Sequence, residues 1–205
     1  LAFVPHQIFS YQQLTHLNHC ALRWMVTMHD IISLRVPTLR DAHLTQAFVT
    51  SLHYADGAIC ISKSVWRDFL SFFGPLAEKR CGSCAVIYNA VEPMAQHVQR
   101  DPRFPERYLL LAGNQMTHKA VDRALEVLDP GIPVVALCGA GVRAPMRTAP
   151  TIFLESGKQS PALLESLYQF CTALIFPSQY EGCGLPLLHA VRCGRPAVAF
   201  FSEST

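Results

Sequence analysis

Short apolar runs recur along the chain, and a longer amphipathic segment follows most of them. The runs are continuous rather than alternating with polar residues, which is typical of strands covered on both faces, as in a parallel sheet between helices. We expect strands at 24–28, 57–61, 84–88, 108–112, 133–138, 151–154, 173–176 and 196–201. The pattern predicts an α/β fold built from parallel sheets.

Helix signals occupy the segments between these runs. Ser62 is placed to cap a helix over 63–73, and Ser160 caps one whose first residue is Pro161. Gly194 follows the end of another amphipathic segment, where a left-handed residue commonly ends a helix. The order of strand and helix is therefore locally consistent.

A proline-containing segment without apolar period, 92–106, reads as an interdomain linker. It separates two α/β regions, 1–91 and 107–205. Two such domains facing each other form a cleft at the carboxyl ends of their strands, where parallel sheets bind ligands.

The composition of the chain disfavours nucleic-acid-binding and membrane-spanning proteins. The chain has 205 residues, 50% hydrophobic and 16% charged, with a formal net charge of +2. This charge disfavours a nucleic-acid partner, because binding a polyanion needs a strongly basic surface. No apolar stretch approaches the ~20 residues that span a bilayer, and no leader-like segment opens the chain. We therefore expect a cytoplasmic protein.

The eight cysteines are expected to be free thiols. Cys60, Cys138 and Cys171 lie in apolar patterns, where a thiol behaves as a small buried hydrophobic group. Cys81 and Cys84 have a spacing that suits zinc or redox chemistry, but a tetrahedral zinc site needs a second pair, which the sequence lacks.

The segment 176–186 joins a predicted strand to a predicted helix and contains Gly182 and Gly184. Such a turn lets the backbone approach a ligand, and the free amides of the helix start favour an anion such as a diphosphate. Glu181 lies beside this turn, where a carboxylate can accept hydrogen bonds from sugar hydroxyls. The alternative is a solvated Glu181 beside a simple turn.

Six segments resemble, in order, the retaining glycosyltransferases of family 4, which have the GT-B fold. The segment 176–186 reads Phe-Pro-Ser-x-Tyr-Glu-Gly-x-Gly-Leu-Pro, and a helix end and strand follow it. The matching segments are 28–30, 55–64, 86–91, 108–119, 176–186 and 190–199. The resemblance implies two Rossmann-like domains: a partial acceptor-side domain (1–91) and a nucleotide-sugar domain (107–205). Relative to the family, the chain is expected to be truncated at its N-terminus and at its C-terminus.

The resemblance also implies roles for single residues. Glu181 matches a glutamate that contacts the donor sugar, and Lys119 matches a basic residue that contacts the donor diphosphate. The amides near Gly184 and Leu185, which follow Gly182, match the phosphate-binding turn. His29 matches a residue on the acceptor side of the cleft, and these matches make Glu181, Lys119 and His29 the candidate catalytic residues.

Two positions depart from the family pattern but remain in the predicted donor-binding set. His189 occupies the position of a second glutamate that accepts hydrogen bonds from the ribose, and an imidazole offers less acceptor capacity. Asn114 stands where many members carry arginine, which leaves Lys119 as the evident cation for the phosphates.

The activity implied by the resemblance is transfer of a hexose, with mannose as the candidate, from a nucleoside-diphosphate sugar to a saccharide or lipid-linked acceptor with retention, as in polysaccharide biosynthesis. Neither a metal nor another cofactor is expected, because the sequence has no Asp-x-Asp motif. One alternative is a GT-B-like binding or assembly module that has lost catalysis. Another is a different GT-B enzyme, such as a sugar-nucleotide epimerase.

An apolar stripe on the predicted helix 63–73 has two interpretations. A core-facing helix is favoured, because only Lys63 and Arg67 flank the stripe. Docking on the cytoplasmic face of a membrane, to reach a lipid-linked acceptor, is the alternative. The stripe residues are Val65, Trp66, Phe69, Phe72 and Phe73.

Overall fold

Every predicted apolar run contains a strand in the computed structural model, which describes residues 1–80, 84–92, 98–139, 141–143 and 145–200. The strands are β1 (Ala2–Val4), β2 (Trp24–Met28), β3 (Gly57–Cys60), β4 (Cys84–Val86), β5 (Leu109–Ala112), β6 (Val134–Cys138), β7 (Thr151–Glu155), β8 (Ala173–Phe176) and β9 (Ala197–Ala199). The short strand β1 was not expected from the pattern.

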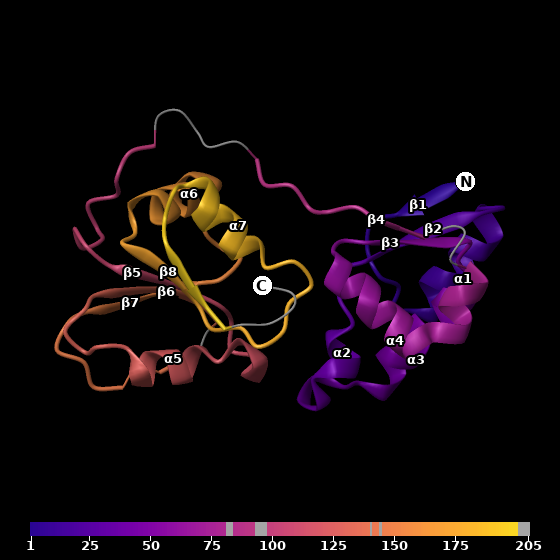
Figure 1. Cartoon of the computed structure of the whole chain (residues 1–205), viewed down its shortest axis with the longest axis horizontal. Helices are drawn as coiled ribbons and strands as arrows, with labels where there is room; N and C mark the ends of the chain where they lie inside the picture. Colours follow the sequence, from indigo (N-terminus) through magenta and orange to yellow (C-terminus); the bar gives the residue numbers. More distant parts are fainter. Residues whose placement is uncertain (81–83, 93–97, 140, 144, 201–205) are drawn as a thin grey trace. The chain divides into compact units, whose positions relative to one another are not determined.

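The chain divides into two units, each built on its own parallel sheet (Figure 1). The first unit holds Leu1–Asn89 together with Glu181–Cys183. The second holds Ala90–Tyr180 and the described residues from Gly184 to Phe200. The α/β class with two parallel sheets is therefore confirmed.

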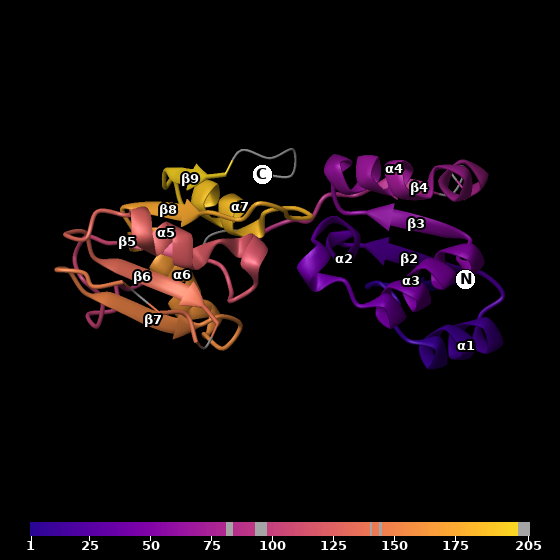
Figure 2. The same ribbon diagram turned by 90° about the horizontal axis from the view of Figure 1, so that it is seen from below.

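The first unit has the strand order β1-β2-β3-β4. Its helices are α1 (Tyr11–Cys20), α2 (Ile32–Arg35), α3 (Ala42–Tyr54) and α4 (Lys63–Arg80). All four lie on the same side of the sheet (Figures 1 and 2). Between them and the sheet lies one core, in which Trp24, Val26 and Phe48 are almost fully buried.

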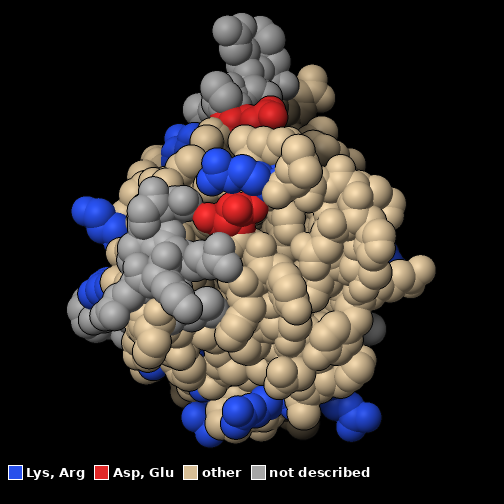
Figure 3. All heavy atoms as spheres, turned by 90° about the vertical axis from the view of Figure 1, so that its right-hand side faces the viewer, with Lys and Arg blue, Asp and Glu red and all other residues tan. Residues whose placement is uncertain are grey.

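Charged side chains are sparse on the face shown in Figure 3. Most of its described surface belongs to uncharged residues, in keeping with the 16% of charged residues in the chain. The Lys and Arg side chains in this view are scattered, mostly toward the margins, and do not form the continuous basic surface that a polyanion would need.

Helix α4 begins as predicted and is interrupted at Phe73, the predicted helix end. The Ser62 hydroxyl accepts a hydrogen bond from the Val65 amide at 3.1 Å. The backbone is not helical at Phe73 (φ −121°, ψ 22°), yet helix resumes beyond it and continues to Arg80. The first helical stretch therefore ends at the predicted residue, and a second stretch, which contains Pro75, follows the kink.

The apolar stripe of α4 faces the core of the first unit. Val65, Phe69 and Phe73 are buried, and Trp66 packs partly against the same cluster. Phe72 remains 42% exposed, and the Arg35 guanidinium lies over its ring. The core-facing interpretation of the stripe is therefore confirmed. In the described part of the chain, no helix combines the length and apolar character that crossing a membrane requires.

The second unit has the strand order β7-β6-β5-β8-β9. Its helices are α5 (Val121–Val127), α6 (Pro161–Phe170) and α7 (Leu185–Arg192). Helix α5 covers one face of the sheet, while α6 and α7 cover the other (Figures 1 and 2). Each face accordingly has its own apolar cluster, one including Leu125 and the other Leu167.

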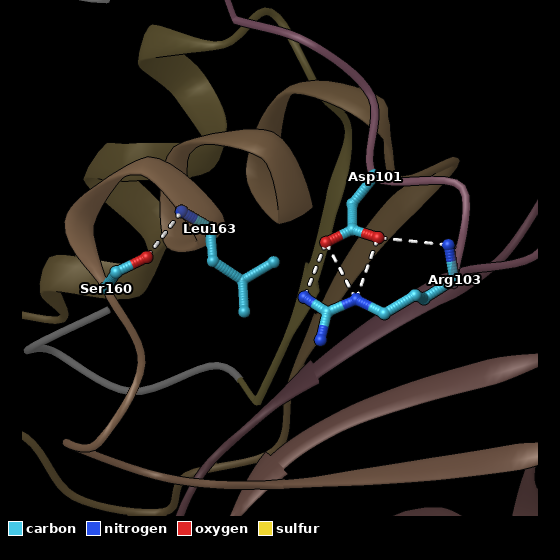
Figure 4. Close-up of polar contacts among 4 residues, drawn as sticks. All are labelled: Asp101, Arg103, Ser160 and Leu163. Atoms are coloured by element: carbon cyan, nitrogen blue, oxygen red, sulfur yellow. Dashed lines mark hydrogen bonds and ion pairs between the residues drawn. The ribbon is translucent and has the colours of Figure 1, made fainter.

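The second unit also contains two local hydrogen-bonded motifs (Figure 4). The Ser160 hydroxyl caps α6 by accepting from the Leu163 amide at 3.2 Å, as the sequence predicts. In the segment expected to be a linker, Asp101 accepts from the guanidinium and amide of Arg103, and these bonds lower the pKa of Asp101. Phe104 follows and packs into the α6/α7 core.

The described cysteines are free thiols. Cys60, Cys138 and Cys171 are buried, and burial raises the pKa of Cys138 and of Cys171 to about 11. They are therefore protonated at neutral pH and pack as hydrophobic groups, as predicted. Cys81 lies outside the described residues, so the expectation of a free thiol there stays a prediction.

Candidate functional site

The strand order of the second sheet reverses next to β5. Strands β6 and β7 follow β5 on one side, whereas β8 and β9 lie on the other. The loops that leave the carboxyl ends of β5 and β8 therefore diverge to opposite faces of the sheet. Such a switch point leaves room for a ligand beyond the strand ends. The loop after β5 carries Lys119, and the loop after β8 carries Glu181 and Gly184.

The loop after β5 is folded tightly onto its own unit. Gly113 is required at the strand end, because a Cβ there would collide with the side chain of Val121. The Asn114 side-chain oxygen accepts from the Met116 amide at 3.0 Å. Asn114, predicted to bind the donor, thus shapes the turn that leads toward Lys119.

Lys119 ends a 3₁₀ turn, Thr117–Lys119, and its side chain is half-buried. Ala120 follows with a left-handed backbone (φ 47°) and precedes α5. Among the described residues, Ala120 is the only one besides glycines with a positive φ. This conformation costs an alanine about 1–2 kcal/mol, so tertiary packing holds the backbone next to Lys119 in a strained state.

The loops after β5, β6 and β8 contact one another. The Gln179 amide donates to the His118 carbonyl at 2.8 Å, which joins the β8 loop to the residue before Lys119. A Cβ on Gly139, at the end of β6, would collide with the Gln115 side chain. The beginning of the β8 loop and the end of β6 thus both pack against the loop that carries Lys119.

The loop after β8 delivers the start of α7. Ser178 is fully buried, and its hydroxyl donates to the Tyr180 carbonyl at 3.1 Å. Gly184 adopts a left-handed conformation (φ 63°, ψ 44°) immediately before the helix. Pro186 has no N–H, and the Leu187 amide bonds to the Gly184 carbonyl. The Leu185 amide, in the first turn, is therefore the donor best placed for an anion.

The remaining predicted residues of this loop lie just before α7. Glu181 is half-buried, and Gly182 is buried. Within the loop, Glu181 precedes the left-handed Gly184 by one short turn. The contact of the Glu181 carboxylate with a donor sugar stays a prediction.

His189 has a setting that the sequence did not reveal. Its ring stacks on the ring of Tyr168 from α6, with centroids 5.2 Å apart and an angle of 28°. Burial lowers the pKa of His189, and the neighbouring Arg192 lowers it further. Arg192 forms an ion pair with Glu165 and also donates to the Glu92 carbonyl. The imidazole is therefore neutral at pH 7 and packs against a neighbouring helix.

His29 follows β2 in the first unit. Its Nε2 donates to the Pro5 carbonyl at 2.9 Å, which fixes the ring and leaves Nδ1 as an acceptor in the neutral form. The neighbouring Asp30 accepts from the Ile32 amide at 2.9 Å at the start of α2. The structure thus supports a capping role for Asp30, while a donor contact of His29 stays a prediction.

Among the described residues, no group of three or more His, Cys, Asp or Glu side chains could hold a metal ion.

Two residues that shape the site were missed from the sequence. Gln115 packs on Gly139, and Ala120 takes a backbone conformation normally left to glycine. Gln115 offers no recognisable signal, since its role depends on a neighbouring strand. The glycine at 139, directly after an apolar run, was a signal for close approach that could have been used.

No model of a known protein family matches the chain. Solved structures with a similar fold include those of TarM and OtsA, and the fold of the chain is the GT-B architecture of two parallel-sheet domains. Sucrose-phosphate synthase from Thermosynechococcus elongatus has a TM-score of 0.64 at 16% identity, over 90% of this chain and 52% of that one.

A second similar structure is a point mutant of TarM from Staphylococcus aureus in complex with fondaparinux, α-GlcNAc-glycerol and UDP. Its TM-score is 0.63 at 16% identity, over 95% of this chain and 40% of that one. Among curated proteins, the serotype-specific mannosyltransferase WbdA of Escherichia coli is 22% identical over 193 residues. The match covers 81% of this chain but 24% of WbdA, so the chain spans about a quarter of that relative.

Proposed function

We propose that this chain is the donor-binding part of a retaining glycosyltransferase. It transfers a hexose, with mannose as the candidate, from a nucleoside-diphosphate sugar to a saccharide or lipid-linked acceptor. The similarity to a mannosyltransferase, and to a structure that contains UDP and saccharides, supports this proposal. Work at the cytoplasmic face of a membrane, in polysaccharide biosynthesis, is part of the proposal.

One observation carries the proposal: the strand order reverses between β5 and β8, with Lys119 on the loop after β5 and the start of α7 after β8. The Gln179–His118 hydrogen bond holds these loops together. A lysine and a helix N-terminus on adjacent loops are a suitable setting for a diphosphate.

In the proposed reaction, the bond between the anomeric carbon and the diphosphate oxygen breaks as the acceptor oxygen attacks the same face of the sugar. The acceptor proton passes to the leaving diphosphate. Lys119 and the Leu185 amide stabilise the charge that develops on the diphosphate, without a metal ion. Glu181 accepts hydrogen bonds from hydroxyls of the donor sugar, and His29 contacts the transferred sugar from the acceptor side.

The first experiment is a calorimetric titration of the purified chain with UDP, GDP and ADP. We expect one nucleotide to bind, and Lys119→Met to weaken it by about tenfold to a hundredfold, because a hydrogen bond from a charged group contributes about 1.5–3 kcal/mol. Lys158→Met is the matched control, since Lys158 is exposed and pairs with Glu155 at 2.8 Å. No binding at millimolar nucleotide would refute the proposal.

The second experiment measures release of the diphosphate from the matching sugar nucleotide. We expect Glu181→Gln to bind the nucleotide as tightly as the native chain but to release it from the sugar much more slowly. If the native chain binds nucleotide and never turns over any sugar nucleotide, with or without saccharide acceptors, it is a binding module instead of an enzyme.

A further inference from the structure

Three residues of the β8 loop, Glu181–Cys183, belong to the first unit, although the residues on either side of them belong to the second. We call these three residues the 181–183 segment. The segment contains Glu181, the candidate for contact with the donor sugar. It packs against residues that follow β2 and β3. The first unit therefore holds a candidate catalytic carboxylate that the chain supplies long after β4.

Gly182 lies against the backbone that follows β2. It is buried, and a Cβ at this position would be 1.8 Å from the carbonyl oxygen of His29 and 3.3 Å from Cδ1 of Ile61. Backbone atoms cannot move aside as the end of a flexible side chain can, so the close approach requires a residue without a Cβ. The glycine at this position is therefore explained by its contact with His29.

This contact brings two candidate catalytic residues together. Glu181 directly precedes Gly182, and His29 provides the carbonyl that Gly182 approaches. The loop that carries His29 is itself anchored to the loop after β1. The His29 ring donates to the Pro5 carbonyl, and the Gln7 side chain donates to the Asp30 carbonyl at 2.7 Å. The 181–183 segment therefore rests on a fixed part of the first unit.

Ser62, which follows β3, also binds the segment. Its hydroxyl donates to the Gly182 carbonyl at 2.6 Å and accepts from the Val65 amide at 3.1 Å. A hydroxyl has one proton and two lone pairs, so one serine both caps α4 and donates to the segment. Ser62 is 7% exposed, so water has little access to replace the bond to Gly182 if the hydroxyl is removed.

Cys183 anchors the end of the segment. Its side chain packs partly against the core of the first unit, and its thiol forms a hydrogen bond with the backbone of Asn89. The residue before it, Gly182, is held by Ser62 and His29. Because these contacts follow Glu181 directly in the chain, they restrict the backbone from which its carboxylate extends.

We propose that Ser62 is a positioning residue for the transfer reaction: its bond to the Gly182 carbonyl fixes where the Glu181 carboxylate lies relative to His29. In this role Ser62 acts through the backbone of the segment. The catalytic consequence rests on the proposed function, whereas the hold on the segment does not. The sequence predicts only the capping role of Ser62, because Gly182 becomes its neighbour only in the folded chain.

Alkylation of the whole chain tests the hold on the segment without any substrate. Iodoacetamide labelling is followed at each cysteine by mass spectrometry of the digested protein. We expect Ser62→Ala to raise the labelling rate of Cys183 by about fivefold or more, because the segment opens more often. Labelling of the exposed Cys20 is expected to stay at the native rate. An unchanged rate at Cys183 would overturn the proposal.

Kinetics test the consequence for Glu181. We expect Ser62→Ala to leave the dissociation constant of the nucleotide unchanged, because the nucleotide lacks the sugar. It is expected to lower kcat for diphosphate release by about tenfold to a hundredfold, since small misplacements around reacting groups have effects of this size. In the Glu181→Gln background, the same substitution is expected to lower kcat by less than about threefold, because the carboxylate that Ser62 positions is gone.

Three further variants separate positioning from helix capping. Ser62→Gly keeps most of the capping but has no hydroxyl, so it is expected to lose as much kcat as Ser62→Ala. Ser62→Thr keeps the hydroxyl and is expected to restore most of the native kcat. Ser160→Ala is the matched control, because it removes the corresponding cap of α6 and is expected to keep the native kcat.

The results distinguish this proposal from the proposed function. If the native chain releases diphosphate while Ser62→Ala keeps the native kcat, the positioning role is overturned and the proposed function stands. The same conclusion follows if Ser62→Ala has an equally large effect in the Glu181→Gln background. If the native chain turns over no sugar nucleotide, the proposed function fails and the catalytic consequence fails with it. The labelling of Cys183 then decides separately whether Ser62 holds the segment.

Discussion

Arg147 closes the carboxyl end of α5, and its removal is expected to destabilise the second unit. The side chain is half-buried, and its two terminal nitrogens donate to four backbone carbonyls in and after the helix end. Nη1 bonds to Leu125 and Leu128 at 3.1 Å each, and Nη2 bonds to Asp129 at 2.7 Å and Ile132 at 3.0 Å. These carbonyls have no helical partner of their own, or lie in the loop that follows.

The magnitude follows from this arrangement. Hydrogen bonds to a charged group contribute about 1.5–3 kcal/mol, and a cation at a helix carboxyl end adds about 0.5 kcal/mol. Ordering the arginine side chain costs about 2 kcal/mol, and water replaces part of the lost bonding in Arg147→Ala. We expect a net loss of about 2 kcal/mol for Arg147→Ala. Arg147→Lys restores less than half of it, since one ammonium cannot reach both pairs of carbonyls.

Urea unfolding followed by circular dichroism measures this loss. With a slope of about 2 kcal/mol per molar, the midpoint of the second unit shifts by about 1 M. Arg143→Ala is the control, because Arg143 is an exposed arginine in the same segment and its loss is expected to change stability by less than about 0.5 kcal/mol. If the midpoint of Arg147→Ala lies within the range of the control, or if Arg147→Lys has the native midpoint, the four Arg147 hydrogen bonds do not stabilise the second unit as argued.

Three further changes test other features of the second unit. Ala120→Gly relieves the strain of the left-handed backbone but makes the unfolded chain more flexible. The net effect is expected to raise the free energy of unfolding by about 0.5–1 kcal/mol, which thermal unfolding measures. The pKa of His189 is held below its usual 6.5, so the unfolded state takes up the proton first as the pH falls. Stability is therefore lost below about pH 6.5, and His189→Phe, which keeps a ring against Tyr168, is expected to flatten that loss in pH-dependent melts. Ser160→Ala removes the cap of Leu163 and is expected to cost about 1 kcal/mol, seen as faster amide exchange at the start of α6.

Much of the fold follows from local pattern. Buried parallel strands read as continuous apolar runs, so β2 and β8 have the bounds predicted from the sequence. β1 has three residues, too few to show a period, and it is a strand only because β2 pairs with it. The glycine and proline at 74 and 75 predicted a helix stop, and the helix is interrupted at Phe73, directly before them. The second helical stretch that continues to Arg80 was not predicted.

The candidate site could be predicted only where the residues that form it are adjacent in the sequence. The turn at 182–186 has its glycines and proline in sequence, so the start of α7 was predictable. The strained Ala120 and the stacking of His189 on Tyr168 were not, because both depend on neighbours brought by other strands and helices. Arg147 was missed for the same reason, since its four partners become neighbours only when α5 ends where it does.

The pairing of β5 with β8 has a consequence for the order of folding. Leu109 is hydrogen-bonded in register with Ala173, so the central strand of the second sheet waits for a partner that is synthesised long after it. Until β8 arrives, β5 has a neighbour only on the β6 side, and its other edge is open to wrong partners. Long-range parallel pairing of this kind is slow. The loop that carries the predicted sugar-contacting carboxylate is therefore assembled at the end of folding. A nascent chain that stops before β8 contains three of the five strands and lacks the proposed donor site.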